Sequence, residues 1–119
     1  MTSGSFRADI AADPRIGIGS VLADLVARGE ALDEPAIAFD SAVDGHPAGH
    51  PLSLRELDRA VAARSAALAA AVAPRDPVAL HVSTAADQLL GYLALARLGA
   101  IPALLNRNLA APVAAEYAA

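Results

Sequence analysis

Two short apolar runs flank one helical segment between residues 77 and 108, and this arrangement constrains the fold more than any other feature of the chain. Residues 78–82 form the first run, and residues 101–105 form the second. The helical segment between them spans 85–98 and stops at Gly99. Two strands joined by one helix are typical of a parallel strand–helix–strand crossover. The sequence therefore predicts the α/β fold class.

The region before this unit predicts one helix and a β-hairpin. Residues 20–31 place apolar side chains at helical spacing, and Ser20 is positioned to cap the start. Residues 36–39 form a short apolar strand, and residues 41–51 are rich in Gly and Pro, which predicts a loop. A second strand begins at Leu52, so the hairpin has a long connection.

Ser53 and Glu56 form a capping-box pattern that predicts the start of a second helix. In this motif the serine oxygen accepts from the amide three residues on, and the glutamate accepts from the amide of the capping residue. The helix is expected to end near Ala73, because Pro74 and Pro77 cannot continue it.

Composition indicates one globular domain. The chain has 119 residues, of which 55% are hydrophobic and 18% charged, which is enough for a modest core. A net charge of -4 argues against nucleic acid or an anionic membrane as an electrostatic partner. All nine basic residues are arginine. No lysine is therefore present to hold a phosphate or to stabilise an adenylate.

Neither a secretory signal nor a membrane span is visible in the sequence. The N-terminal residues lack a continuous apolar stretch. The longest apolar candidate, 89–105, is interrupted by Arg97 and Pro102 and is shorter than the ~20 residues that a bilayer requires. The absence of cysteine excludes disulfides and thiolate catalysis. We expect a cytoplasmic protein without a transmembrane segment.

Two ordered segments resemble the signatures of one enzyme family. Residues 52–57, LSLREL, look like a start signature in which an aromatic residue usually stands where this chain has Leu54. Residues 95–106, LARLGAIPALLN, are similar to a second signature with a small residue, glycine and alanine before an apolar strand. Together they resemble the N-terminal segment of adenylate-forming (AMP-binding) enzymes, which include acyl-CoA synthetases, luciferases and nonribosomal peptide synthetase adenylation domains. The resemblance implies the N-terminal portion of that fold, a β-hairpin plus a parallel strand–helix–strand unit flanked by helices.

Within the family, residues 104–109, LLNRNL, look most like an acyl-CoA synthetase or fatty-acid-CoA ligase, of the kind active in fatty acid metabolism. An adenylation domain of a nonribosomal peptide synthetase is the alternative. The resemblance implies that a carboxylic acid substrate attacks the α-phosphate of ATP to form an acyl adenylate, which a thiol then accepts. ATP, Mg²⁺ and coenzyme A are expected for the complete enzyme, with a carrier protein as the other possible thiol acceptor, and none of these cofactors is expected to bind this segment.

The segments that do this chemistry in the family have no counterpart in this chain. A Ser/Thr/Gly-rich phosphate loop with lysine and a C-terminal lysine are both absent. We therefore expect a flexible N-terminal arm at 1–19 and, at 20–119, an incomplete N-terminal subdomain of an ATP-dependent acid-thiol ligase, separated by design, a split gene or cleavage. This chain alone should be inactive, and its partner would be the remainder of the parent enzyme.

Two other functional classes remain open from the sequence. The chain could be a non-catalytic interaction module or a half-enzyme that complements a separately encoded remainder. It could also be an independent α/β binding domain. Because residues 85–98 are apolar nearly all round, one face of that helix is expected to lie exposed, so self-association through exposed apolar faces is expected.

Three groups of candidate residues have simpler structural explanations than a site. Gly17 and Gly19 precede a helix but lack the third glycine and the preceding strand of a dinucleotide loop, so a turn is expected. His46 and His50 lie in the Gly/Pro-rich loop with no further ligand assigned, so a solvated loop is expected. His81 should face away from the apolar side of its strand, as a partly buried, hydrogen-bonded side chain.

Polar residues also follow the two strands of the crossover. Ser83, Thr84 and Asn106 lie where ligands gather in parallel sheets, but Thr84 can cap the next helix and Asn106 can close a turn. Tyr92 and Tyr117 are expected to be packing residues. No catalytic, cofactor-binding or metal-binding residue is assigned from the sequence.

Overall fold

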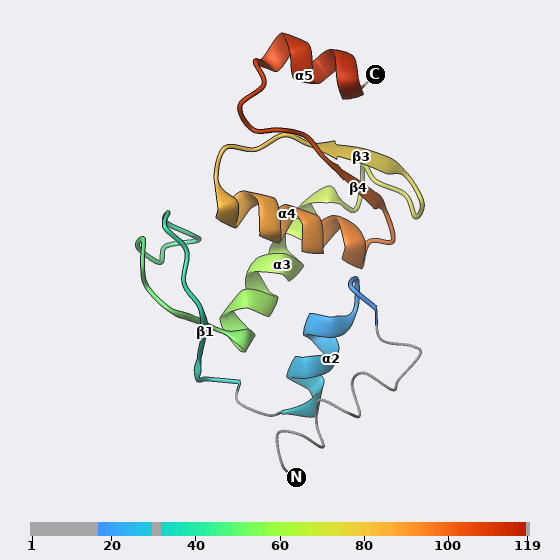
Figure 1. Ribbon diagram of the computed structural model, residues 1–119. Coiled ribbons are helices and arrows are strands. Elements are labelled where there is room, and N and C mark those ends of the chain that lie inside the picture. The colour runs from blue at the N-terminus through green and yellow to red at the C-terminus, as the bar shows by residue number, and fades with distance from the viewer. Residues whose placement is uncertain (1–16, 30–31, 119) are drawn as a thin grey trace.

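Helices and short strands alternate along the residues that the computed structural model describes, 17–29 and 32–118 (Figure 1). The elements, in chain order, are α2 (Val21–Arg28), β1 (Pro35–Ile37), β2 (Leu52–Ser53), α3 (Leu54–Leu68), β3 (Pro77–Leu80), α4 (Ala85–Arg97), β4 (Ile101–Leu104) and α5 (Ala111–Ala118). β1 pairs with β2 antiparallel, and β3 pairs with β4 parallel. The predicted α/β class is confirmed. Residues 1–16 of the predicted arm lie outside the described residues.

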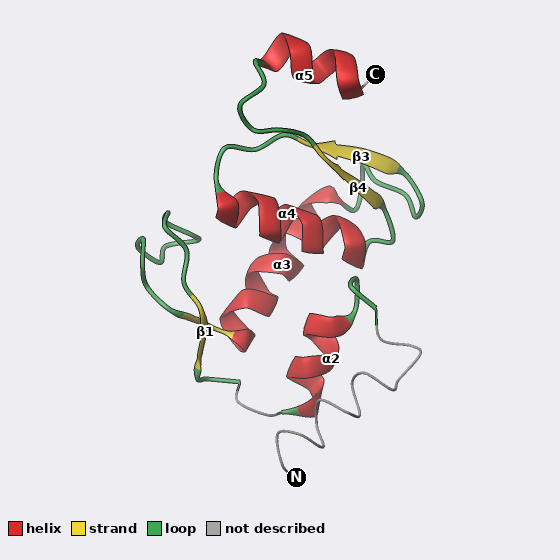
Figure 2. Ribbon diagram, viewed as in Figure 1, coloured by secondary structure: helices red, strands yellow, loops and turns green. Residues whose placement is uncertain are grey.

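The strand–helix–strand unit is present as predicted, with slightly shorter strands. β3 and β4 run in register from Pro77 opposite Ile101 to Leu80 opposite Leu104. α4 connects them and lies across one face of the pair (Figure 2). Leu80 packs over Gly91 of α4, where an added Cβ would lie 3.0 Å from a Leu80 methyl carbon. The absence of a side chain at Gly91 therefore brings the helix close to the strand.

The hydrophobic core lies mainly between α3 and α4. Leu57 and Val61 of α3 are buried, as are Leu90 and Leu95 of α4. In α3 these positions recur every turn, so one stripe of the helix faces α4. α4 in turn contacts both α3 and the β3–β4 pair. It is therefore enclosed on two sides, which explains why the helix is apolar around most of its circumference.

The open apolar face predicted for α4 is present only in part, because Leu89 and Tyr92 are partly buried around a hollow. In the described part of the chain, the large apolar side chains with the greatest exposure lie elsewhere: Ile18, Ile101, Leu104, Val113 and Tyr117. The sheet explains the difference, because α4 covers one face of β3–β4 and leaves much of the other in water. Ile101, which projects from the face of β4 away from α4, is 56% exposed. The open apolar surface is thus on the sheet.

α3 begins at the predicted capping box and ends earlier than predicted. Ser53 Oγ accepts from the Glu56 amide at 3.1 Å, and Glu56 Oε1 accepts from the Ser53 amide at 3.1 Å. The helix ends at Leu68, not near Ala73. Its apolar stripe ends there as well, and the next residues form turns in which the Ala73 amide donates to the Asp76 carboxylate. The two prolines thus follow a chain that has already left the helix.

α2 is shorter than the predicted helix 20–31. It ends at Arg28, because Gly29 takes the left-handed conformation at φ 80°. Residues 30 and 31 lie outside the described residues. Ser20 occupies the N-cap position without a side-chain capping bond. Its hydroxyl instead accepts from the Gly17 amide at 3.1 Å, which closes the preceding turn.

The predicted hairpin with a long connection is confirmed, although β1 covers Pro35–Ile37 rather than 36–39. Phe39 follows the strand and is buried in the core. Hydrogen bonds and an ion pair hold the loop after it in place. Val43 and His46 exchange backbone hydrogen bonds at 2.9 and 2.8 Å, and Arg64 of α3 binds both carboxylate oxygens of Asp44. This Gly/Pro-rich loop is therefore held against the start of α3.

None of the helices in the described residues is both long enough and apolar enough to cross a membrane.

Candidate functional site

The carboxyl ends of β3 and β4 lie at one edge of the parallel pair, where the sequence placed Ser83, Thr84 and Asn106. Thr84 Oγ1 accepts from the Asp87 amide at 3.0 Å, so its side chain caps α4. Asn106 Oδ1 accepts from the Asn108 amide at 2.9 Å and forms a turn after β4. Ser83 is exposed between the strand and the helix. Thr84 and Asn106 thus already have local structural roles.

His81 lies just beyond the end of β3. Its Nε2 is 3.1 Å from the Leu109 carbonyl oxygen, so this nitrogen donates the proton of the contact. The residue is exposed rather than partly buried, because the α5 side of the sheet is only loosely covered there. Together with Ala79 and Leu105 it lines a hollow between the sheet and α5. The predicted hydrogen bond of His81 and its orientation away from α4 are present, and the partial burial predicted for it is wrong.

Gly17 and Gly19 lie in a hydrogen-bonded turn that precedes α2. The amides of Ser20 and Val21 both donate to the Gly17 carbonyl oxygen, at 3.0 and 2.9 Å. A Cβ on Gly19 would overlap the carbonyl oxygen of Ala96, so this glycine packs against the last turn of α4. These contacts give both glycines a local structural role in the predicted turn.

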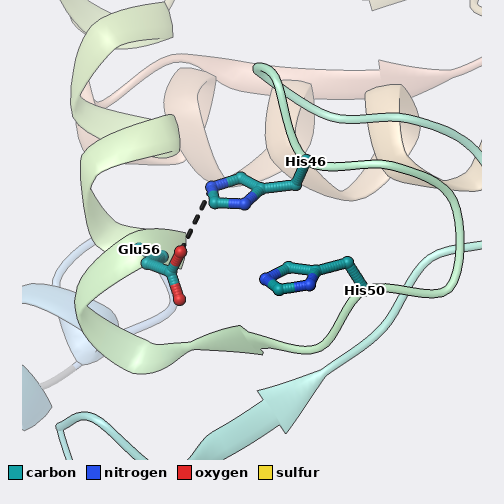
Figure 3. Close-up of side chains that lie close together, drawn as sticks. All are labelled: His46, His50 and Glu56. Carbon is teal, nitrogen blue, oxygen red and sulfur yellow. Dashed lines mark ion pairs between the residues drawn. The ribbon is translucent and has the colours of Figure 1, made fainter.

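His46, His50 and Glu56 form the one His/Cys/Asp/Glu cluster of metal-binding dimensions among the described residues. One ligand atom from each side chain lies within 4.8 Å of the other two. His46 Nε2 is 3.1 Å from Glu56 Oε2. The two imidazole rings are stacked, with centroids 5.1 Å apart and planes 6° apart. Figure 3 shows both rings projecting from the loop toward the carboxylate at the start of α3.

Glu56 is electrostatically the best-defined member of this cluster. The hydrogen bond from the Ser53 amide, the largest influence, lowers the pKa of Glu56 below its usual value, and the Ser53 hydroxyl and the two histidines act in the same direction. Partial burial of the carboxyl opposes this shift. A carboxylate that stays ionised and oriented is suited to binding a cation or a protonated imidazole.

The sequence did not predict that Glu56 lies beside the histidines. The residue was assigned to the capping box, and the chain separation between His50 and Glu56 crosses a strand. The structure shows that one carboxylate serves both arrangements, with Oε1 toward Ser53 and Oε2 toward His46. The available signal was the short distance in sequence between the loop and an acidic residue in the first helical turn.

The two tyrosines differ. Tyr92 of α4 lines a hollow with Ala85, Gln88, Leu89 and Leu104, in partial agreement with its predicted packing role. Tyr117 of α5 is 71% exposed, so the packing role predicted for it is wrong in this structure. α5 ends the described residues and presents this side chain to solvent.

The chain has arginine as its only basic residue besides histidine, so no lysine is present to contact a nucleotide phosphate. The cluster of His46, His50 and Glu56 offers nitrogen ligands, which Mg²⁺ disfavours relative to oxygen.

Comparison with known proteins relates the chain to larger enzymes. No family model matches it. It is 45% identical over 114 residues to 3-aminoavenalumate diazotase of a Streptomyces species, an alignment that covers 93% of this chain. The chain spans 20% of the length of that relative.

Solved structures match the fold. The NpsA N-terminal subdomain of Klebsiella oxytoca superposes with a TM-score of 0.64 and 22% identity over 82% of this chain, which corresponds to 23% of that chain. The same subdomain matches equally well when bound to 3-hydroxybenzoyl-AMSN. An artificial fusion of NpsA with ThdA, described as an adenylation-PCP di-domain, gives a TM-score of 0.62 and 23% identity over 76% of this chain and 16% of its own. The fold is that of an adenylation N-terminal subdomain. In this adenylation fold, the described chain supplies the hairpin, the helix pair and the parallel strand–helix–strand unit predicted from the sequence.

Proposed function

We propose that this chain is the N-terminal portion of an adenylate-forming enzyme and serves as scaffold rather than as catalyst. The observation that supports this most is the agreement of two independent comparisons. One is the adenylation fold over 82% of the chain, and the other is 45% identity to a stretch that makes up 20% of 3-aminoavenalumate diazotase. Neither relative is matched over more than a quarter of its own length.

The exposed face of β3–β4 supports the scaffold role. Parallel sheets are normally covered on both faces, and here α4 covers one face while Ile101 of β4 stays 56% exposed on the pair. The outer edges of β3 and β4 have no partner strand among the described residues. The remainder of the enzyme would cover this face and extend the sheet, and it would also supply the nucleotide-binding and catalytic groups.

For the substrate we propose an aromatic carboxylic acid. The relatives support the adenylation-domain alternative over the fatty-acyl-CoA synthetase expected from residues 104–109. NpsA was solved with a 3-hydroxybenzoyl group, and the name of the diazotase refers to 3-aminoavenalumate. The complete enzyme would join such an acid to AMP from ATP with Mg²⁺, before transfer to a thiol of coenzyme A or of a carrier protein.

Diazotisation of an aromatic amine is a second candidate activity for the complete enzyme. The 45% identity to 3-aminoavenalumate diazotase favours it over the more distant structural matches. The two activities differ in their co-substrate, because diazotisation needs a source of the second nitrogen, such as nitrite, and carboxylate adenylation does not.

Reconstitution tests the scaffold role. The Streptomyces diazotase would be produced without the segment that matches this chain, and the purified 119-residue chain would be added to it. We expect a complex in size-exclusion chromatography and recovery of ATP consumption with 3-aminoavenalumate. The matching segment of the diazotase itself serves as positive control.

The assay separates the candidate activities. Pyrophosphate release that depends on the acid alone indicates carboxylate adenylation, and release that also requires nitrite indicates diazotisation. Hexadecanoate is the fatty-acid control and should give background release. If the positive control forms a complex and restores activity while this chain does neither, the scaffold proposal is wrong.

A further inference from the structure

We propose that His46, His50 and Glu56 bind a divalent transition metal, with Zn²⁺ as the best-fitting ion. This site does not rest on the proposed function, because its residues belong to the hairpin loop and the first turn of α3 and not to the β3–β4 pair. Two imidazoles and one carboxylate are an established ligand set for zinc sites that keep a position open to solvent.

The distances are close to what a zinc ion requires. Zinc–nitrogen and zinc–oxygen bonds of about 2.0–2.2 Å in tetrahedral geometry place neighbouring ligand atoms roughly 3.3–3.5 Å apart. His46 Nε2 and Glu56 Oε2 are 3.1 Å apart, which nearly meets this spacing. The widest separation within the triad is at most 4.8 Å. Because His50 is exposed, rotation of its side chain can close the difference.

The backbone around the ligands is already fixed. His46 is held by its paired backbone hydrogen bonds to Val43, and the Gly49 amide beside His50 donates to the Phe39 carbonyl at 2.7 Å. Asp44 of the same loop is bound in bidentate fashion by Arg64 of α3. The loop therefore presents both histidines to α3 without first having to be ordered, which lowers the entropic cost of binding an ion.

Glu56 has the orienting partner that metal-binding carboxylates usually have. Its Oε1 accepts from the Ser53 amide at 3.1 Å, so Oε2 is the oxygen directed toward His46. Such second contacts fix the direction of a ligand and strengthen metal binding. The positive end of the α3 dipole disfavours a cation here, and the Glu56 carboxylate opposes that effect at the first turn.

A bound ion would join the hairpin loop to α3 by coordination. In its absence, the same residues form a hydrogen-bonded His46–Glu56 pair with a stacked His50. These two states make opposite predictions for His50, which contributes a ligand in the first and only a ring contact in the second.

Metal titration of the 119-residue chain, produced without a histidine tag, distinguishes the two states. Zn²⁺ binding would be measured by calorimetry, and Co²⁺ binding by its visible absorption. We expect one ion per chain, and at least ten-fold weaker binding in His50→Ala and Glu56→Gln. Glu56→Gln keeps an oxygen that can accept from Ser53, so the capping contact is preserved. His81→Ala is the matched control and should bind as the unmodified chain does.

His50→Ala decides the question if Glu56→Gln is poorly folded, because His50 is exposed and circular dichroism can confirm an unchanged helix content. Paramagnetic broadening by Co²⁺ in NMR spectra should be centred on the His46 loop and the first turn of α3. The proposal is overturned if the chain binds no Zn²⁺ at millimolar concentration, if His50→Ala binds with unchanged affinity, or if the broadening is centred elsewhere.

Discussion

Arg97, in the last turn of α4, donates a hydrogen bond from Nη2 to Oδ1 of Asp58 in α3 over 2.6 Å. Both side chains are largely buried, at 22% and 24% exposure. Asp58 follows the LSLREL segment directly, and Arg97 lies within LARLGAIPALLN. The ion pair therefore joins α3, which begins within the first of these segments, to the second segment. The hydrogen bond from Ser65 Oγ to the Ala94 carbonyl oxygen is a further contact between α3 and α4.

Replacing Asp58 by Asn should lower the free energy of unfolding by about 1.5–3 kcal/mol, the range for hydrogen bonds to charged groups. The loss is expected because Arg97 would keep its charge in a partly buried position without a counterion. Denaturant unfolding would measure it. Asp33→Asn is the matched control, since Asp33 pairs with Arg55 at 83% exposure and should contribute less than about 1 kcal/mol. Equal effects of the two substitutions would contradict a special role for the α3–α4 pair.

Protonation of Glu56 should lower the free energy of unfolding as the pH falls. Its pKa is lower in the folded chain than its usual value, chiefly through the Ser53 amide, so the unfolded state binds the proton more tightly. This contribution is complete above the unfolded pKa of about 4.3 and is lost as the pH falls through the lower folded pKa. Urea unfolding at a series of pH values from above the unfolded pKa downward would show the decline in the free energy of unfolding. The Glu56→Gln variant should show a smaller decline over the same pH range. An unchanged profile in that variant would refute the assignment to Glu56.

Gly19→Ala should destabilise the packing of the turn before α2 on the last turn of α4. The new Cβ would overlap the Ala96 carbonyl oxygen, and backbone on both sides must shift to relieve the contact. Overpacking of this kind costs about 1–3 kcal/mol. Gly17→Ala provides the control, since a Cβ there would meet no atom within 4 Å, and its effect should stay within about 0.5 kcal/mol. Thermal unfolding of both variants measures the difference.

Self-association of the isolated chain should depend on β4. Ile101 and Leu104 project from opposite faces of β4 and are each about half exposed, and the edge of β4 has no partner among the described residues. A second copy that pairs along this edge can cover apolar area on both faces. Sedimentation velocity should show a concentration-dependent mass that falls toward that of the monomer in the double variant Ile101→Thr and Leu104→Thr. Threonine keeps a favourable strand propensity and removes apolar area.

Ile18→Thr serves as the control for this experiment, because Ile18 is equally exposed but lies outside the sheet. A monomeric wild-type chain at high concentration would contradict the prediction, and so would an equal effect of the control.

Local signals predicted most of the fold. The capping box at Ser53, the cap at Thr84 and the strand–helix–strand order are encoded within a few neighbouring residues, and each is present in the structure. The end of α3 was misplaced because prolines mark where a helix must stop and not where packing ceases to support it. The exposed apolar surface was predicted on α4 and lies largely on the sheet. The sequence of a helix that is apolar all round does not show which of its faces are covered by other elements.

The candidate metal site was the least accessible to sequence reasoning. His46 and His50 were recognised as a pair in a loop, but their meeting with Glu56 depends on how the hairpin folds back on α3. The carboxylate was assigned one role by its spacing from Ser53, and only the structure shows that its second oxygen faces the histidines. A side chain with two partners is difficult to detect from sequence spacing. Once one pattern, here the capping box, explains the residue, nothing in the sequence indicates a second partner.

Ser53 is both the last residue of β2 and the cap of α3, with no linker between the strand and the helix. One inserted residue before it would reverse the faces of β2, which repeat every two residues. The same insertion would leave α3 capped but rotate its attachment to the hairpin by about 100°. The orientation of α3 is thus coupled to the register of the hairpin through one serine. A shift in the strand register would therefore turn Leu57 and Val61 away from α4.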